Sequence, residues 1–148
     1  MNILEKALLL AVQAHAGQLD KSGRPYILHP LRLMAQMDSQ EAQLVALLHD
    51  IVEDTSTTFD DLSQLGLPEN VLEAIRLLTH DKTNEPYQNY MTCLKTNPLA
   101  RKVKLADLKD NMNIRRLSQV TAKDTERLNK YLWAWNFLTG DEENGDEL

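Results

Sequence analysis

The sequence predicts an all-α protein that forms a single helical domain. Apolar residues recur at helical spacing in nearly every segment, which is typical of amphipathic helices. Residues that start and stop helices separate these segments, and no run of alternating apolar and polar residues between glycines predicts a strand. The 148 residues, 43% of them hydrophobic and 26% charged, suit one domain with its own core. We place this domain at residues 1–140, followed by an acidic tail at residues 141–148.

The first two predicted helices are separated by a loop. In the first helix the apolar residues share one face, namely Leu4, Ala7, Leu8, Ala11 and Val12. Glycines and a proline then interrupt the helical period over residues 17–26, which predicts a loop. Pro30 can occupy the first turn of a short second helix over residues 30–37.

A longer central helix is expected to run from a cap at Asp38 or Ser39 to about Glu53. Asp38 and Glu41 have the spacing of a capping box. A short helix over residues 57–66 follows, with a threonine in front and a glycine as its stop.

The C-terminal half contains four further predicted helices, at residues 68–80, 85–97, 97–112 and 121–138. A proline starts the first of them, and an asparagine–proline pair starts the third. The last helix places Tyr131, Trp135 and Leu138 at the spacing of one apolar face.

Charge and cysteine content limit the partners and the compartment that we expect. The net charge is −6, but five acids lie in the tail at residues 141–148, which we expect to be disordered. The rest holds 16 basic and 17 acidic residues, so it lacks the basic stripe of a nucleic-acid-binding surface. No run of about 18 apolar residues predicts a membrane span. Cys93 is the only cysteine, which fits a reducing compartment, and we expect a cytoplasmic protein.

The stretch LLHDIVEDT, residues 47–55, places four polar side chains on an otherwise apolar helix. Positions four apart share a helix face, so His49 would lie over Glu53 and Asp50 over Asp54. Burying several ionised carboxylates together is costly unless a positive charge neutralises them. A divalent cation would do so, and imidazole with carboxylate suits manganese, iron, zinc or a related metal.

Two further residues are candidate metal ligands. His29 lies at a predicted helix start, and Asp107 lies on the predicted helix over residues 97–112, with Asn111 one turn later on the same face. Two histidines and two aspartates would leave coordination positions open for water or substrate, which is typical of a catalytic site.

The motifs AHAGQ, KSGRPYILHP, ALLHDIVEDT and KLADLKDNM together resemble those of HD-domain hydrolases of the RelA/SpoT type. The resemblance covers about residues 4–117 and is closest to the stand-alone small alarmone hydrolases. It implies a helical bundle around one manganese ion and hydrolysis of the 3′-pyrophosphate of guanosine tetra- or pentaphosphate.

The resemblance also implies a role for nine residues of this chain. The metal ligands would be His29, His49, Asp50 and Asp107. The acidic pair for water activation and proton transfer would be Glu53 and Asp54. The substrate contacts would be Lys21, Ser22 and Asn111.

Four positions depart from the family pattern, and none of them belongs to the proposed ligand set. Asp20 stands where the family has an arginine, and we expect this acid to repel a polyphosphate. Leu108 and Asp110 replace a basic residue and a histidine, and Ile114 replaces a threonine. These changes bear on the substrate. One alternative is therefore an HD phosphohydrolase that acts on an adenine alarmone, the 2′-phosphate of NADPH or a deoxynucleotide, and another is a non-catalytic nucleotide-binding module.

Overall fold

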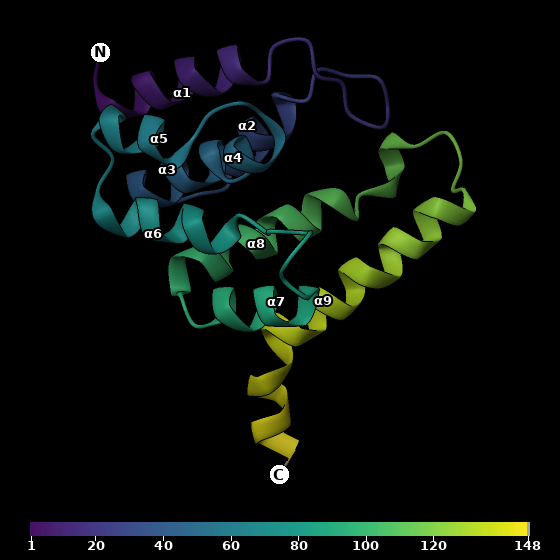
Figure 1. The fold of residues 1–148 in the computed structure, drawn as a ribbon. Coiled ribbons are helices and arrows are strands. Elements are labelled where there is room, and N and C mark those ends of the chain that lie inside the picture. The colour runs from purple at the N-terminus through teal and green to yellow at the C-terminus, as the bar shows by residue number, and fades with distance from the viewer. Residues whose placement is uncertain (148) are drawn as a thin grey trace.

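The computed structural model describes the backbone of residues 1–147 and the side chains of residues 1–140. Within this part the chain forms helices and no β-strand, which confirms the predicted fold class. In chain order the helices are α1 (Ile3–Ala14), α2 (Leu28–Ala35), α3 (Gln40–Leu48), α4 (Ile51–Asp54), α5 (Phe59–Leu65), α6 (Glu69–Leu78), α7 (Tyr87–Lys95), α8 (Pro98–Asn111), the 3-10 helix η1 (Ile114–Arg116) and α9 (Ala122–Glu147) (Figure 1).

Helix α3 lies at the centre of the fold and contacts α1, α2, α6 and α8. Its Leu44, Val45, Leu47 and Leu48 are all at most 1% exposed, so the C-terminal half of this helix is buried on every side rather than along one stripe. A polar side chain that directly follows α3 is therefore delivered into the interior.

Helix α8 is the second element that organises the interior. It contacts α2, α3, α6 and α7, and α9 packs against it as the chain leaves the bundle (Figure 1). Asn97 caps α8 by accepting a hydrogen bond from the backbone N–H of Ala100, and Pro98 occupies the first turn, as the sequence predicts. The buried face of α8 presents Asp107 and Asp110 beside Val103.

Helix α2 begins two residues earlier than predicted, at Leu28. The N–H of His29 donates to the carbonyl of Tyr26 at 2.9 Å, and the N–H of Leu31 donates to Ile27 at 3.2 Å. Pro30 falls in the first turn, where a backbone N–H has no partner inside the helix, so the missing donor costs nothing. His29 therefore lies within a helix rather than in the loop before it.

The predicted central helix is interrupted, which corrects the expectation of one continuous helix to Glu53. Helix α3 ends at Leu48, and α4 begins at Ile51. Nδ1 of His49 lies 2.7 Å from the carbonyl oxygen of Ala46, which in a continuous helix would accept the N–H of Asp50. At the other end Ser39, rather than Asp38, caps α3 by accepting from the N–H of Ala42.

The boundary between the helical domain and the acidic tail, which the sequence places after residue 140, stays a prediction. The acidic tail at residues 141–148 lies outside the side chains that the structure describes. In the described part of the chain, no helix combines the length and the apolar character that crossing a membrane requires.

Candidate functional site

Four side chains that are far apart in the sequence meet beside α3. His29 comes from α2, His49 and Asp50 from the turn between α3 and α4, and Asp107 from α8. One donor atom from each lies within 4.8 Å of the others. His29, His49 and Asp107 are buried, and Asp50 is half-buried. The structure thus brings together the four predicted metal ligands.

His29 is held between two carboxylates of α8. Its Nε2 lies 2.8 Å from Oδ1 of Asp107, and its Nδ1 lies 2.7 Å from Oδ2 of Asp110. Burial raises the pKa of Asp110, but the hydrogen bonds from His29 and Arg32 bring this pKa far below its usual range. An ionised carboxylate only accepts, so Nδ1 donates to Asp110 and, by the same argument, Nε2 donates to Asp107. Nε2 is the nitrogen that faces the other candidate ligands, and a bound cation would replace its hydrogen.

His49 is oriented by the backbone instead. Nδ1 donates to the carbonyl of Ala46, so Nε2 is the nitrogen that points into the cluster. This Nε2 is buried and has no hydrogen-bond partner among the described residues. It lies 2.9 Å from Oδ2 of Asp50 and 3.5 Å from Oδ1 of Asp107, without the geometry of a hydrogen bond. A buried nitrogen left without a partner beside two carboxylates fits a metal ligand.

The electrostatics of the cluster favour a divalent cation. Burial lowers the pKa of His49, but the charges of Asp50 and Asp107 outweigh this effect and raise it well above the usual value. Burial raises the pKa of Asp107, but Lys104 and the two imidazoles bring it well below the usual range. The carboxylates thus attract positive charge, which a cation can supply in place of imidazole protons. Two nitrogen and two oxygen donors suit a divalent metal ion.

Lys104 is a charged neighbour that the sequence analysis did not single out. Its Nζ lies 3.2 Å from Oδ2 of Asp107, and its side chain is only 16% exposed. It also lies over the ring of Tyr90, at 5.5 Å from the centroid. Three residues separate Lys104 from Asp107 on a predicted helix, so the shared face could have been noticed. Asn111 contacts the same aspartate, since its Nδ2 donates to Oδ1 at 3.1 Å.

Tyr26 is a second missed neighbour. Its hydroxyl donates to Oδ2 of Asp50, and its ring lies between the rings of His15 and His29. Burial and the negative charge of Asp50 raise the pKa of Tyr26, so the phenol stays protonated and acts as a donor. Tyr26 lies three residues before His29, but nothing local in the sequence indicates its contact with Asp50.

The predicted acidic pair lies on α4, beside the cluster. Oε1 of Glu53 accepts from the N–H of His80 at 2.5 Å, and Oε2 lies 3.8 Å from Nζ of Lys82. Asp54 is exposed, and its N–H donates to the carbonyl of Asp50 at 3.0 Å, so the predicted one-turn relation between these two residues is retained. Burial raises the pKa of both acids, and the charge of Asp50 raises it further. Carboxyl groups with a raised pKa are suited to proton transfer near neutral pH.

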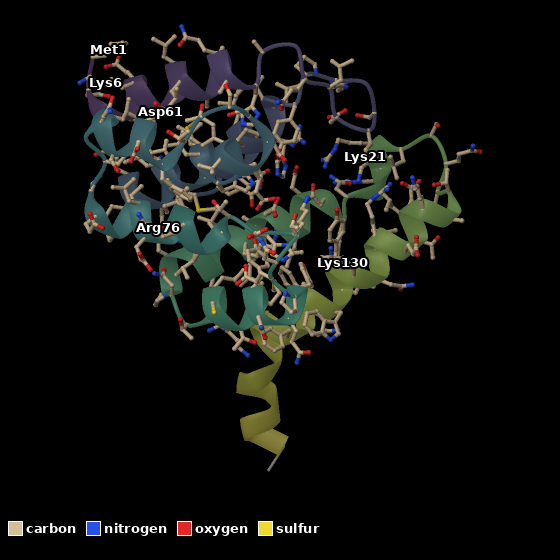
Figure 2. The ribbon with its side chains drawn as sticks, in the orientation of Figure 1. Met1, Lys6, Lys21, Asp61, Arg76 and Lys130 are labelled. Atoms are coloured by element: carbon tan, nitrogen blue, oxygen red, sulfur yellow. The ribbon has the colours of Figure 1, made fainter. Side chains whose placement is uncertain are left out.

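A cleft of about 610 Å³ opens over the cluster and the acidic pair. Its lining includes seven cationic side chains, Lys21, Arg32, Lys82, Lys104, Arg116, Arg127 and Lys130. Figure 2 marks two of them, Lys21 on the loop after α1 and Lys130 on α9. A cleft that combines a metal cluster with this many cations suits a ligand that carries several negative charges.

The loop before α2 contributes Lys21 and Ser22 to the same cleft. Asp20 also has a role within this loop. Its Oδ1 accepts from the N–H of Ser22 at 2.9 Å, the hydroxyl of Ser22 at 2.8 Å and the N–H of Arg24 at 2.9 Å. Gly23 has a φ of 82°, which closes the turn. Asp20 therefore shapes the loop, and repulsion alone does not describe its role.

This fold and this cluster define the class of protein: an all-helical domain built around a histidine–aspartate site for a divalent metal. The family model of the HD domain matches residues 9–112, and the chain belongs to this family.

The relatives confirm the resemblance to the RelA/SpoT type. The bifunctional (p)ppGpp synthase/hydrolase SpoT of Escherichia coli (strain K12) is 36% identical over 122 residues, which cover 74% of this chain and 17% of SpoT. The guanosine-3′,5′-bis(diphosphate) 3′-pyrophosphohydrolase of Aquifex aeolicus (strain VF5) is 29% identical over 119 residues, which cover 74% of this chain and 17% of that protein. The chain thus spans about 17% of the length of these curated relatives.

A solved structure is similar over nearly the whole chain. It is a metazoan ortholog of SpoT, described as hydrolysing ppGpp and playing a role in starvation responses. The two structures superpose with a TM-score of 0.74 at 25% sequence identity, and the match covers 95% of this chain and 87% of the other.

Proposed function

We propose that this protein is a metal-dependent hydrolase that removes the 3′-pyrophosphate of guanosine tetra- or pentaphosphate and yields GDP or GTP. One observation carries the proposal. His29, His49, Asp50 and Asp107 meet beside Glu53 and Asp54 in a cleft lined by cations, in a domain whose relatives include hydrolases of this name.

The proposed cofactor is one Mn²⁺ ion, held by the Nε2 atoms of His29 and His49 and by the carboxylates of Asp50 and Asp107. Other divalent transition metals share these ligand preferences. When bound, such an ion lowers the pKa of a water molecule and polarises a phosphoryl oxygen. Tyr26, as a hydrogen-bond donor to Asp50, would orient that carboxylate.

The acidic pair would move the protons of the reaction. Water attacks the phosphorus that is bonded to the 3′-oxygen, and the bond between this phosphorus and the 3′-oxygen breaks. Glu53, placed by the N–H of His80 and by Lys82, would accept the proton of the water. Asp54, exposed in the cleft with a raised pKa, would donate a proton to the 3′-oxygen of the departing nucleoside.

The cations of the cleft would bind the two pyrophosphate groups of the substrate. Lys21 and Arg127 both line the cleft, and burial and the charge of Arg127 lower the pKa of Lys21, although Asp124, the ion-pair partner of Arg127, raises it. A phosphate between these two cations would relieve their repulsion. We propose Lys21, Ser22 and Asn111 as direct substrate contacts; all three line the cleft.

A different nucleotide is the second candidate substrate, and the geometry of the loop around Asp20 supports this alternative. The carboxylate of Asp20 accepts from both the N–H and the hydroxyl of Ser22, so Ser22 would have to leave Asp20 before it donates to a phosphate. An adenine alarmone, NADPH or a deoxynucleotide could be the better ligand for such a loop.

A nucleotide panel with two products measured separately tests the proposal. Purified protein is loaded with Mn²⁺, Zn²⁺ or, without oxygen, Fe²⁺, and is incubated with ppGpp, pppGpp, an adenine alarmone, NADPH and deoxynucleotides. We expect release of pyrophosphate from the guanosine alarmones, and none from the Asp107→Ala variant. Phosphate from NADPH, or products from a deoxynucleotide alone, would establish the second candidate. Tight binding of ppGpp to metal-loaded protein without turnover would identify a binding module.

A further inference from the structure

Asp110 is a buried carboxylate that lies behind the metal cluster rather than in it. Its Oδ2 is 2.7 Å from Nδ1 of His29, on the side of the ring that faces away from the other ligands. Its side chain is 6% exposed. The resemblance to the family offered no role for it, because the family has a histidine at this position.

Two arginines hold the carboxylate of Asp110 in place. Arg32 is one turn after His29 on α2, and it donates from Nε to Oδ1 and from Nη2 to Oδ2, both at 2.9 Å. Such a two-point contact restrains the plane of the carboxylate as well as its position. Arg116, from η1, lies 3.3 Å from Oδ2 and also donates to the main-chain carbonyl of Asp110.

This arrangement gives Asp110 its own counter-charges. The guanidinium groups of Arg32 and Arg116 balance the negative charge of Asp110, so this charge does not require neutralisation by the proposed metal cation. Both of its oxygens have partners, and Asp110 does not belong to the group of donor atoms that meet within 4.8 Å. Asp110 is therefore suited to position a metal ligand and not to bind the metal ion itself.

The two histidines of the cluster differ in the group that accepts the hydrogen bond from Nδ1. The neutral carbonyl of Ala46 accepts from Nδ1 of His49, whereas an ionised carboxylate accepts from Nδ1 of His29. A carboxylate partner fixes the tautomer and ring orientation of a histidine that binds a metal. It also makes the other ring nitrogen more basic, so that this nitrogen binds the metal more strongly.

We propose that Asp110, clamped by Arg32 and Arg116, is the positioning residue of the metal ligand His29. It keeps the hydrogen on Nδ1, leaves Nε2 free to bind the ion, and strengthens that bond. The inference rests on the metal site of the proposed function and does not depend on which nucleotide is hydrolysed.

Metal affinity of the metal-free protein is the quantity to measure. Wild type, Asp110→Asn and Asp110→Glu are titrated with Mn²⁺ and Zn²⁺ in competition with a chelating dye. His29→Ala is the reference for loss of the ligand. Asp38→Asn is the matched control, because Asp38 is also paired with a basic side chain, Lys102, but lies outside the cleft.

Asp110→Asn keeps the shape of the side chain and loses its charge. We expect its metal affinity to fall about 10- to 100-fold, the usual effect of removing such a partner. Asp110→Glu should recover part of the loss, and Asp38→Asn should bind as wild type does.

A measurement on the wild type keeps the inference falsifiable even if the variants fail to fold. In the Zn²⁺-loaded protein, nitrogen-15 spectra of the histidine rings should show His29 with its hydrogen on Nδ1 and zinc on Nε2. Zinc on Nδ1 of His29, or an unchanged metal affinity in folded Asp110→Asn, would overturn the inference. If wild type does not bind metal, and His29→Ala shows the same lack of binding, the proposed metal site itself is overturned.

Discussion

The floor and the rim of the cleft are built in different ways. The metal floor, defined as His29, His49, Asp50 and Asp107, is made of side chains that helices and buried partners hold from behind. The nucleotide rim, defined as the loop at residues 17–25, is held mainly by hydrogen bonds within itself, three of which the carboxylate of Asp20 accepts.

The two regions also differ in how closely they follow the family. The metal floor has every residue that the RelA/SpoT resemblance implies, whereas the rim has Asp20 where an arginine is expected. From this contrast we infer two separate roles: the metal floor would carry out the hydrolysis, and the nucleotide rim would determine which nucleotide binds. The experiments below would break or sharpen this division.

Removing a residue of the metal floor should have the largest effect. Asp107→Ala deletes a proposed metal ligand and leaves His29, His49 and Lys104 without their shared carboxylate. We expect loss of the bound ion and of all measurable hydrolysis, while far-UV circular dichroism still reports a helical protein. Metal quantification on the dialysed variant provides the check, and full metal occupancy would show that Asp107 is not a ligand.

The acidic pair should have the next largest effect, on turnover and not on metal content. Glu53→Gln and Asp54→Asn retain the shape and lose the proton-transfer group. Each should lower kcat by roughly 10²–10⁴-fold, the usual range for general acid–base catalysis. Steady-state kinetics combined with metal analysis tests this. Turnover near the wild-type rate in both variants, with metal bound, would assign the pair a structural role.

Metal binding should stabilise the fold through the floor alone. An ion present at 100 times its Kd contributes about 2.7 kcal/mol, which for a chain of this size raises Tm by about 5–10 °C. Scanning calorimetry with and without a chelator would measure this shift. The same shift is expected in Asp20→Ala and none in Asp107→Ala. A smaller shift in the Asp20 variant would show that the rim and the floor are coupled.

Changes at the rim should have the smallest effect, confined to KM. Asp20→Ala removes the common acceptor of the loop, and we expect KM for the polyphosphate substrate to rise about fivefold, which corresponds to about 1 kcal/mol. Asp20→Asn keeps an oxygen acceptor and removes the charge, so its KM should equal or fall below that of wild type. If both variants instead lower KM by the same factor, repulsion by Asp20 and not loop shape controls binding.

Much of the fold could be predicted because its signals are local. Asn97 with Pro98 marks the start of α8, and Gly66, with a φ of 92°, ends α5 as expected. The four candidate ligands could be proposed as a set because each lies in a recognisable motif. Even the role of Asp20 is local, since the side chain of an aspartate commonly accepts from the backbone N–H two residues later and so organises a turn, here with Gly23 next in the chain.

The rest depends on contacts between distant residues. The end of α3 at Leu48 involves one hydrogen bond between the ring of His49 and the carbonyl of Ala46, which the helical period does not reveal. The contact between His29 and Asp110 joins residues 81 positions apart. A buried aspartate on a helix has no local mark that separates a metal ligand from its partner.

The clamp around Asp110 also limits the order in which this chain could have acquired its present residues. A single exchange of Asp110 for the histidine of the family would leave Arg32 and Arg116 without their shared carboxylate, and such uncompensated partly buried charge is costly. Loss of Arg116 first would still leave Asp110 paired with Arg32 on two bonds. Among related chains, positions 32, 110 and 116 should therefore vary together, and intermediates that keep the aspartate with a single arginine should be more common than those that keep both arginines without it.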